Sequence, residues 1–381
     1  MTNQKKLLTL AVSSAVLVGC GGSGSSSVVG SDESVTPTTQ IDASSYTDYT
    51  YFNLETGSEV SLTAAEAAAS TAWHIGFRRN GAILNGGTSG IGNVEGALAA
   101  AQDDFYSGDD ADVNVFLNAS DAIEEEHLLA SYDTSLLTFV SDSENLAVSG
   151  DWYNYQHVGG GNPPNTSANS DNSWLIRSAE GDSYARMKAT YFLYDYAHAE
   201  VTFEFDVQAQ GTSQILDSNE SFVVNVMPGQ SECYDFDTAA EVACSDASWD
   251  VQFELPAPPA RGFNVRTNGG ISGSGNGGVF GPLTTTDAEA YTSATMAPGS
   301  GRDISNHYVT DSNASIFTAN EWYAYNLEGN HKLWPNYRTY TIDTDATDAD
   351  AKVYNLQIIN YYDGTGTSGY PTIRFVENTS N

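Results

Sequence analysis

The sequence is poor in positive charge. Its 381 residues contain 14 lysines and arginines against 49 aspartates and glutamates, which gives a net charge of -35. Such a surface repels phosphate backbones and anionic headgroups, so nucleic-acid binding is excluded. Charged residues make up only 17% of the chain, whereas aromatic residues reach 11%. This composition is typical of strands and turns rather than of long helices, and it predicts a secreted, mostly β protein.

The sequence also lacks a hydrophobic run long enough to cross a membrane. The apolar run over residues 7–18, behind Lys5 and Lys6, is too short to span a bilayer and is typical of a signal peptide. It ends in Leu17-Val18-Gly19-Cys20, which resembles a bacterial lipobox. We therefore expect removal of residues 1–19, lipidation of Cys20 and a flexible Gly/Ser linker over 20–40. The lipid would be the only membrane contact, on the cell-surface or periplasmic face of the outer membrane.

Cysteine is scarce as well. With Cys20 assigned to the lipid anchor, only Cys233 and Cys244 remain. In an oxidising compartment this pair predicts one local disulfide, and two free buried thiols are the alternative. A third cysteine is lacking nearby, which argues against a zinc site.

Four sequence anchors occur twice, in the same order. In the first copy they are Tyr51 to Leu54, Trp73 to Phe77, Leu84 to Gly92 and Trp152 to Tyr155. In the second copy they are Cys233 to Phe236, Trp249 to Phe253, Thr267 to Gly275 and Trp322 to Tyr325. We predict a tandem duplication, with domains at 41–210 and 233–381 and an inter-domain segment at 211–232.

Local patterns predict a few individual elements. Residues 201–208 alternate apolar and polar side chains, which predicts a strand with one buried face. The Asn-Gly-Gly segments favour tight turns between strands. Helix is expected in the Ala-rich stretch 93–102 and from a cap at Ser120 or Asp121 through Ala130.

At its anchors the sequence resembles the HmuY family of haem-binding bacterial surface lipoproteins. The resemblance rests on Ile41 to Tyr46, Trp73 to Arg79, Leu84 to Gly90 and the Trp152 segment, in that order, and continues in the second copy to about residue 376. It implies an all-β fold, with an open, hand-like arrangement of two sheets and a few short helices in each domain. It also implies that the protein captures haem, iron protoporphyrin IX, for an outer-membrane receptor or transporter.

The resemblance further implies that two histidines bind the haem iron from opposite sides. Trp152 to His157 matches the family's Trp-x-x-x-x-His segment, so His157 inherits one ligand role. The family's partner histidine lies about thirty residues earlier, which points to His127 by spacing alone. Tyr153, Tyr155 and Val158 would line the pocket, and Arg78, Arg79, Arg177 and Arg186 are the cations available for the propionates. The alternatives are an exposed loop residue for His157 and a solvated helix residue for His127.

The second copy departs from the ligand pattern. Leu327 stands where the first copy has His157, so this position cannot bind iron. His307, His331 or Met296 are possible substitutes. We expect a second domain without haem. His74 is expected to be structural, because the other copy has Asp250 there, and His198 is a weaker alternative ligand.

Enzyme activity is not expected. Neither glycine-rich segment spells Gly-x-Ser-x-Gly, and neither has the strand-helix context of a dinucleotide-binding fingerprint. Two axial imidazoles would leave no open position on the iron, which suits a carrier. The main alternative to haem capture is a surface binding or interaction module that uses the same scaffold for another ligand.

Overall fold

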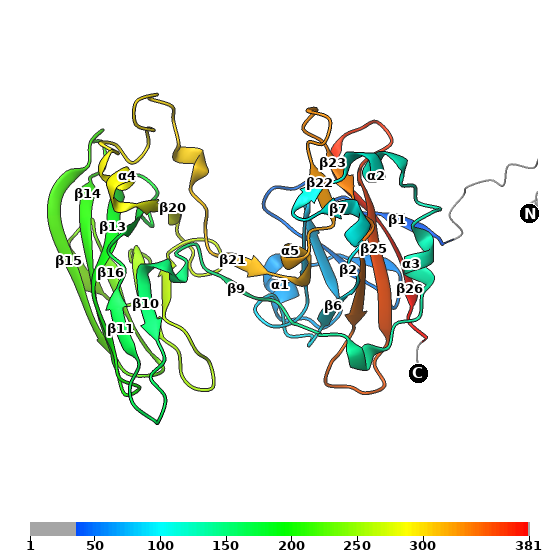
Figure 1. The fold of residues 1–381 in the computed structure, drawn as a ribbon, viewed down its shortest axis with the longest axis horizontal. Coiled ribbons are helices and arrows are strands. Elements are labelled where there is room, and N and C mark those ends of the chain that lie inside the picture. Colours follow the sequence, from blue (N-terminus) through cyan, green and yellow to red (C-terminus); the bar gives the residue numbers. More distant parts are fainter. Residues whose placement is uncertain (1–35, 380–381) are drawn as a thin grey trace, which may run out of the picture.

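A computed structural model describes residues 36–379, which form two β lobes joined by a ribbon (Figure 1). The predicted signal peptide and Cys20 lie outside the described residues. The end of the predicted linker is folded, because β1 (Thr38–Gln40) pairs with β26 (Ser368–Glu377). The N–H of Thr36 also donates to Oε1 of Glu125 at 2.7 Å. Within 36–379, no helix has the length and apolar character needed to cross a membrane.

The terminal lobe, residues 36–142 and 315–379, packs two antiparallel sheets face to face. The larger sheet has the order β1, β26, β25 (Val353–Tyr362), β24 (Thr339–Asp343) and β6 (Glu95–Ala100). The smaller sheet has the order β3 (Ser58–Val60), β2 (Thr50–Asn53), β4 (Ile75–Arg78) and β5 (Gly81–Leu84). Apolar side chains of both sheets, such as Phe77 and Leu356, form one core.

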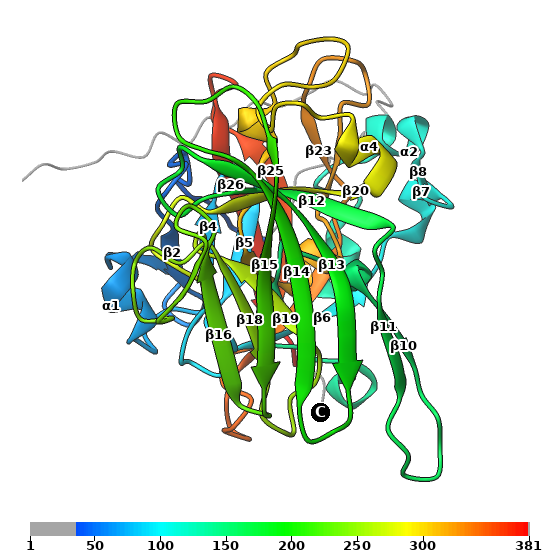
Figure 2. The ribbon, with the colours of Figure 1, turned by 90° about the vertical axis from the view of Figure 1, so that its left-hand side faces the viewer.

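The central lobe, residues 146–311, repeats this arrangement. Its larger sheet has the order β15 (Leu216–Val226), β14 (Ala199–Gln208), β13 (Tyr184–Tyr194), β12 (Asn172–Arg177) and β20 (Gly278–Thr284). Its smaller sheet has the order β17 (Ala240–Val242), β16 (Gln230–Asp235), β18 (Val251–Leu255) and β19 (Asn264–Thr267). Figure 2 shows this lobe nearest the viewer, with the long strands β13, β14 and β15 side by side. The all-β prediction is confirmed.

Short elements complete the two lobes. The hairpins are β7 (Tyr106–Ser107) with β8 (Asp110–Ala111), β10 (Tyr153–Gln156) with β11 (Asn165–Ala168), and β22 (Tyr323–Tyr325) with β23 (Leu333–Pro335). The α-helices are α1 (Ala64–Ala68), α2 (Val113–Asn118), α3 (Glu125–Leu129), α4 (Thr285–Glu289) and α5 (Ile316–Ala319). Single 3₁₀ turns occur at Asp103–Phe105, Thr134–Leu136, Gly150–Trp152 and Ser305–His307. All of these helices are short, as expected.

Each lobe combines the first half of one sequence copy with the second half of the other. In the terminal lobe β6 of the first copy pairs with β24 of the second, with Ala97 opposite Thr341. In the central lobe β12 pairs with β20, with Ile176 opposite Val279. The chain leaves the terminal lobe through β9 (Ser143–Asn145) and returns through β21 (Ser312–Ala314), and these two strands pair as the crossover ribbon.

The spatial lobes therefore differ from the expected division at 211–232. Most of that segment belongs to β15 and β16, inside the central lobe. The physical reason is that β15 pairs along β14, with Val201 opposite Val224, while β16 contributes Tyr234 to the same core. A cut at 211–232 would divide this core.

Two local expectations have different outcomes. The strand at 201–208 is confirmed within β14, whose side chains alternate between buried and half-buried. The helix expected at 93–102 is wrong, because residues 95–100 form β6 and pair with β24. Strand pairing with a distant segment outweighs the helix propensity of alanine there. The other expected helix is present only as the short α3.

The glycine-rich segments anchor the crossover ribbon and are more than hairpin turns. Asn85 is fully buried, and its Nδ2 donates to the carbonyls of Ser70 and Trp73 at 2.9 and 2.8 Å. Gly87 has φ +60°, and a Cβ there would lie 1.8 Å from the carbonyl oxygen of Asp142, just before β9. Gly270 has the same relation to Asp311, just before β21. Only glycine permits this close approach at both ends of the ribbon.

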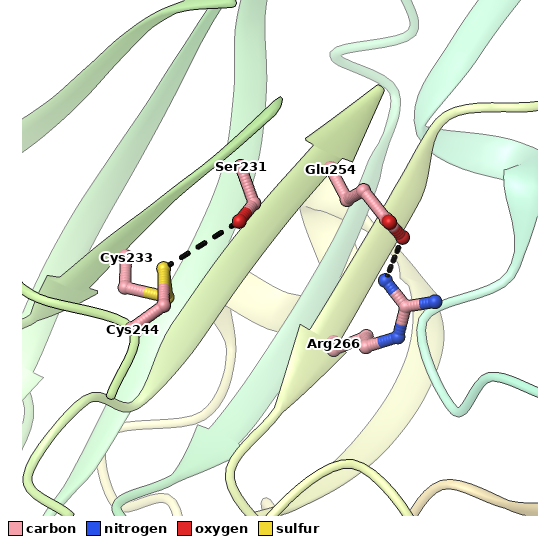
Figure 3. The surroundings of a disulfide bond; sticks show 5 residues. All are labelled: Ser231, Cys233, Cys244, Glu254 and Arg266. Atoms are coloured by element: carbon pink, nitrogen blue, oxygen red, sulfur yellow. Dashed lines mark hydrogen bonds and ion pairs between the residues drawn. A yellow bond between two sulfur atoms is a disulfide. The ribbon is translucent and has the colours of Figure 1, made fainter. Parts of the chain in front are cut away.

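The predicted disulfide is confirmed. Cys233 in β16 is bonded to Cys244, with a Cα–Cα distance of 5.2 Å (Figure 3). The same sheet carries Arg266 of β19, which bonds to Glu254 of β18 and also to Glu144 of the ribbon at 2.6 Å. This second ion pair ties the ribbon to the central lobe.

Candidate functional site

His157 lies on an exposed hairpin of the central lobe. It directly follows β10, and its side chain is exposed. The hairpin reaches beyond the end of the sheet (Figure 2). Of the predicted pocket residues, Tyr155 and Val158 are 46% and 36% exposed, whereas Tyr153 packs on Trp152 with ring centroids 4.6 Å apart. The surroundings of His157 fit the alternative of an exposed loop residue.

His127 lies in the other lobe, on α3. Its Nε2 is 3.9 Å from a carboxylate oxygen of Glu124 and 3.8 Å from one of Glu126. Burial raises the pKa of Glu124, and the nearby His127 opposes that rise. The helix rests on β25, where Nδ2 of Asn355 donates to the carbonyl of Leu128 at 3.1 Å.

The structure therefore does not bring His127 and His157 together. α3 lies in the terminal lobe and β10 in the central lobe, on opposite sides of the ribbon (Figure 1). The thirty-residue spacing assumed that one sequence copy folds on itself. Because the chain crosses between the lobes at β9, residues on either side of β9 belong to different cores.

The end of the central lobe that carries the β10–β11 hairpin, here called its tip, is filled by an aromatic side chain. A loop over residues 256–263 joins β18 to β19 and places Phe263 among the rings near the β10–β11 hairpin. Its ring centroid lies 5.1 Å from that of Tyr153, 4.8 Å from Phe192 and 4.9 Å from Tyr194. Phe263 thus occupies the space between the hairpin and the end of β13.

The corresponding tip of the terminal lobe contains a groove of about 730 Å³. Its aromatic and apolar lining comes from Tyr323, Tyr325, Leu333, Tyr361 and Tyr362. Its polar lining includes Arg79, Asn80, Glu321, His331, Lys332 and Ser368. We call this site the tyrosine groove. Its size falls within the range of about 300–1,000 Å³ typical of small-molecule sites.

The two tips differ in the length of one loop and in the residue that ends it. The turn from β4 to β5 contains only Arg79 and Asn80, and Asn80 stands where the other lobe has Phe263. The carbonyl of Asn80 accepts from Nε1 of buried Trp322 at 2.9 Å, and its Nδ2 donates to the Tyr323 hydroxyl at 2.8 Å. Asn80 therefore lines the groove and is bonded to Trp322 and Tyr323 without filling the groove.

The charge of the tyrosine groove is unusual for this chain. Nη1 of Arg79 donates to the carbonyls of Ser44 and Ser368 at 3.2 and 3.1 Å, which fixes its guanidinium in the wall. Lys332 is exposed on the hairpin side. Against these two cations the lining residues include one acid, Glu321. In a protein of net charge -35, this lining is therefore locally positive.

Two exposed side chains with atoms that can bind a metal, Tyr325 and His331, meet in the groove lining. We call the part of the groove that they line its outer end. The hydroxyl of Tyr325 and Nδ1 of His331 are 2.7 Å apart. The loop between β22 and β23 is tied by two hydrogen bonds of 2.7 Å, from the N–H of His331 to Oδ1 of Asn326 and from the N–H of Asn326 to the carbonyl of Lys332. Tyr325 and Tyr323 are two residues apart in β22, so both face the groove.

The remaining candidates have other roles or positions. His74 is buried and its Nδ1 accepts from the N–H of Leu54 at 3.1 Å, which confirms the structural role. His198 lies between Asp195 and Glu200, at 2.9 and 3.3 Å.

Three of the predicted cations are engaged elsewhere: Arg78 over the Tyr49 ring, Arg177 over the Tyr308 ring and Arg186 with Asp206. Arg79 alone of the four lines the groove. His307 lies beside Arg302, and Met296 is exposed on the same loop.

Sequence reasoning did not find the tyrosine groove as a site. Its residues come from both copies, with Arg79 and Asn80 from the first and the β22–β23 hairpin from the second. The Trp322 to Tyr325 anchor and the Asn80 to Phe263 difference were both readable in the sequence. The sequence does not show that the two copies exchange halves, and only this exchange brings Asn80 and the β22–β23 hairpin side by side.

Of three comparisons with known proteins, one identifies a family. The family model described as HmuY protein matches residues 45–206 and again residues 216–375. No curated protein matches the chain. Among solved structures, a crystal structure from Bacteroides fragilis described as a candidate lipoprotein is 10% identical, with 89% of each chain covered and a TM-score of 0.29. The two family matches confirm the resemblance and the duplication.

Proposed function

Because this chain belongs to the HmuY family, a haem-binding family, we propose that it captures haem in the tyrosine groove of the terminal lobe. The single observation that carries the proposal is the composition of this groove: aromatic walls, two cations and an exposed phenol-imidazole pair in a strongly acidic chain. These are the three features that an iron porphyrin with two propionates requires.

The lining residues fit haem part by part. The porphyrin face is apolar and aromatic, and Tyr323, Tyr361 and Leu333 offer walls of that kind. The propionates are anionic, and Arg79 and Lys332 are the cations at the groove. Burial raises the pKa of Tyr323 and of Tyr361, so these two side chains serve as neutral walls. The atoms proposed to bind iron are therefore those of Tyr325 and His331 at the outer end of the groove.

The proposal places the protein at the outer membrane as a carrier. The lipobox at Cys20 would tether it, and the segment after Cys20 would connect the lipid to β1. An outer-membrane receptor would then accept the haem. We propose binding without catalysis, because a site that delivers intact haem gains from an occupied axial position on the iron.

A titration of the mature chain with haemin tests the proposal. We expect the Soret absorption to shift and to saturate at about one haemin per chain. The matched variant Asn80→Phe places a ring in the groove as Phe263 does in the other lobe, so its affinity should fall at least about tenfold. A wild-type chain without a Soret change, or an Asn80→Phe variant that binds like the wild type, would contradict the site. The first of these results would favour the alternative of a surface module for another ligand.

A further inference from the structure

We propose that Tyr325 is the iron ligand of the tyrosine groove, through its phenol oxygen, and that His331 is the positioning residue that accepts its proton. This inference rests on the proposed function and deepens it. It replaces a pair of axial histidines by one phenolate whose basicity is set by a hydrogen-bonded imidazole. The observation behind it is the 2.7 Å contact between the Tyr325 hydroxyl and Nδ1 of His331.

The other tyrosines of the groove are less available. The Tyr323 hydroxyl accepts a hydrogen bond from Asn80, and the Tyr362 hydroxyl accepts one from the N–H of Leu333 at 2.9 Å. Tyr361 is buried, packs on Trp322 and lies beneath the guanidinium of Arg79. Tyr325 is 58% exposed and lies at the outer end, so its oxygen can approach an iron held over the groove.

The hairpin holds this pair in one arrangement. Asn326 and His331 both have a left-handed backbone, with φ of 63° and 57°. Oδ1 of Asn326 accepts from the N–H of His331, which closes the loop between the two side chains. A Tyr–His contact prepared in this way needs little ordering when the ligand binds. In the other lobe Gln156 and His157 follow Tyr155, and the loop there extends over residues 157–164.

The proton and the charge balance in a simple way. As the bond from the Tyr325 oxygen to ferric iron forms, the phenol proton passes to Nδ1 of His331, and dissolved haemin loses the water or hydroxide that it carried. No electron moves. The resulting imidazolium then donates a hydrogen bond back to the phenolate, a charge-assisted contact that fixes the ligand. Tyrosine is an established ligand of haem iron in proteins.

The alternative within the same groove is direct ligation by a nitrogen of His331. That arrangement would make Tyr325 a hydrogen-bond partner and no more. The two assignments differ in what the iron spectrum reports, because only a phenolate bond produces a phenolate-to-iron charge-transfer band and an iron–phenolate stretching vibration.

Absorption and resonance Raman spectra of the haemin-loaded mature chain test the assignment. We expect the wild type to show the phenolate signature. Tyr325→Phe should lose it, with at least a tenfold lower affinity for haemin. His331→Gln should keep the signature and bind severalfold more weakly, because the proton acceptor is lost but the ligand remains. Tyr155→Phe, at the equivalent position of the other lobe, is the matched control and should change neither property.

The possible results separate this inference from the proposed function. If haemin binds and Asn80→Phe blocks it, but Tyr325→Phe keeps the wild-type spectrum and affinity, the groove stands and the ligand assignment is overturned. The assignment is equally overturned if His331→Gln abolishes the iron spectrum while Tyr325→Phe does not. If the wild type binds no haemin, both proposals fail. Because Tyr325 is mostly exposed, folding of the variant can be verified by its circular dichroism.

Discussion

The two lobes share one framework and differ at their tips. Each has a five-stranded and a four-stranded sheet, a buried asparagine in its glycine-rich segment and a buried tryptophan before its tip hairpin. In the central lobe Phe263 packs against the tip rings, whereas in the terminal lobe Asn80 leaves a groove. The comparison teaches that a duplicated fold can keep the packing of its core while one side chain and one loop decide whether its tip is filled or open.

The same comparison separates the family's histidine pattern from the tyrosine groove. The Trp152 to His157 segment that matches the family best lies in the lobe whose tip is occupied by Phe263. The segment without the matching histidine, Trp322 to Leu327, lies beside the groove. A motif names a position in the sequence, and the packing around it decides whether a ligand fits.

The largest expected effect concerns the exchange of halves. Glu95 lies opposite Asp343 in the β6–β24 pair, and Arg177 lies opposite Gly278 in the β12–β20 pair. The variant Glu95→Cys with Asp343→Cys should therefore form a second disulfide almost completely, since directly opposite strand positions are within bonding range. Peptide mapping of the oxidised protein would locate the bond.

The matched control for this prediction is Glu95→Cys with Arg177→Cys. These two positions would be opposite each other only if each sequence copy folded on itself. In the exchanged arrangement they lie in different lobes, so no bond should form within the chain. A bond in the control and none in the first variant would show that the halves are not exchanged.

The second prediction contrasts the two tips in stability. Phe263→Asn removes a half-buried ring from an aromatic cluster, which should lower the free energy of unfolding by about 2–3 kcal/mol. The reciprocal Asn80→Phe adds a ring to an open groove and loses one hydrogen bond, so we expect a change within about 1 kcal/mol. Chemical denaturation of both variants measures the contrast. Equal losses in the two variants would mean that the tips are packed alike.

The smallest effect concerns a position that holds Asp250 in the central lobe and His74 in the terminal lobe. Both side chains accept a backbone N–H from the neighbouring strand region, from Phe236 at 3.0 Å and from Leu54 at 3.1 Å. Burial raises the pKa of Asp250 to about 8, although hydrogen bonds from Ala179 and Phe236 oppose the rise. Burial lowers the pKa of His74.

The two positions should respond to pH with opposite sign. Because the pKa of Asp250 is raised on folding, its contribution to stability is present below about pH 4 and is lost as the pH rises to about 8. Because the pKa of His74 is lowered, its contribution is present above about pH 6.5 and is lost as the pH falls.

Denaturation of the wild type, Asp250→Asn and His74→Asn at pH 5 and pH 8 measures this difference. The stability advantage of the wild type over Asp250→Asn should shrink by about 1 kcal/mol or more between pH 5 and pH 8. Its advantage over His74→Asn should grow over the same interval. Parallel pH profiles for the two variants would contradict the opposite shifts.

Much of the fold could be predicted from the sequence, because the signals are local. The alternation at 201–208, the cysteine pair and the repeated anchors each depend on neighbouring residues, and each is present in the structure. The tyrosine groove could not be predicted, because it depends on which halves pair. Asn80 and Tyr323 are far apart in the chain, and a repeat alone does not say whether a copy folds on itself or with the other.

A crystal structure of the mature chain loaded with haemin tests the central claim most directly. The account predicts one porphyrin in the tyrosine groove, with its iron beside Tyr325 and its propionates toward Arg79 and Lys332. A porphyrin bound at His157 on the central-lobe hairpin, or a saturated protein whose groove holds no porphyrin, would contradict it.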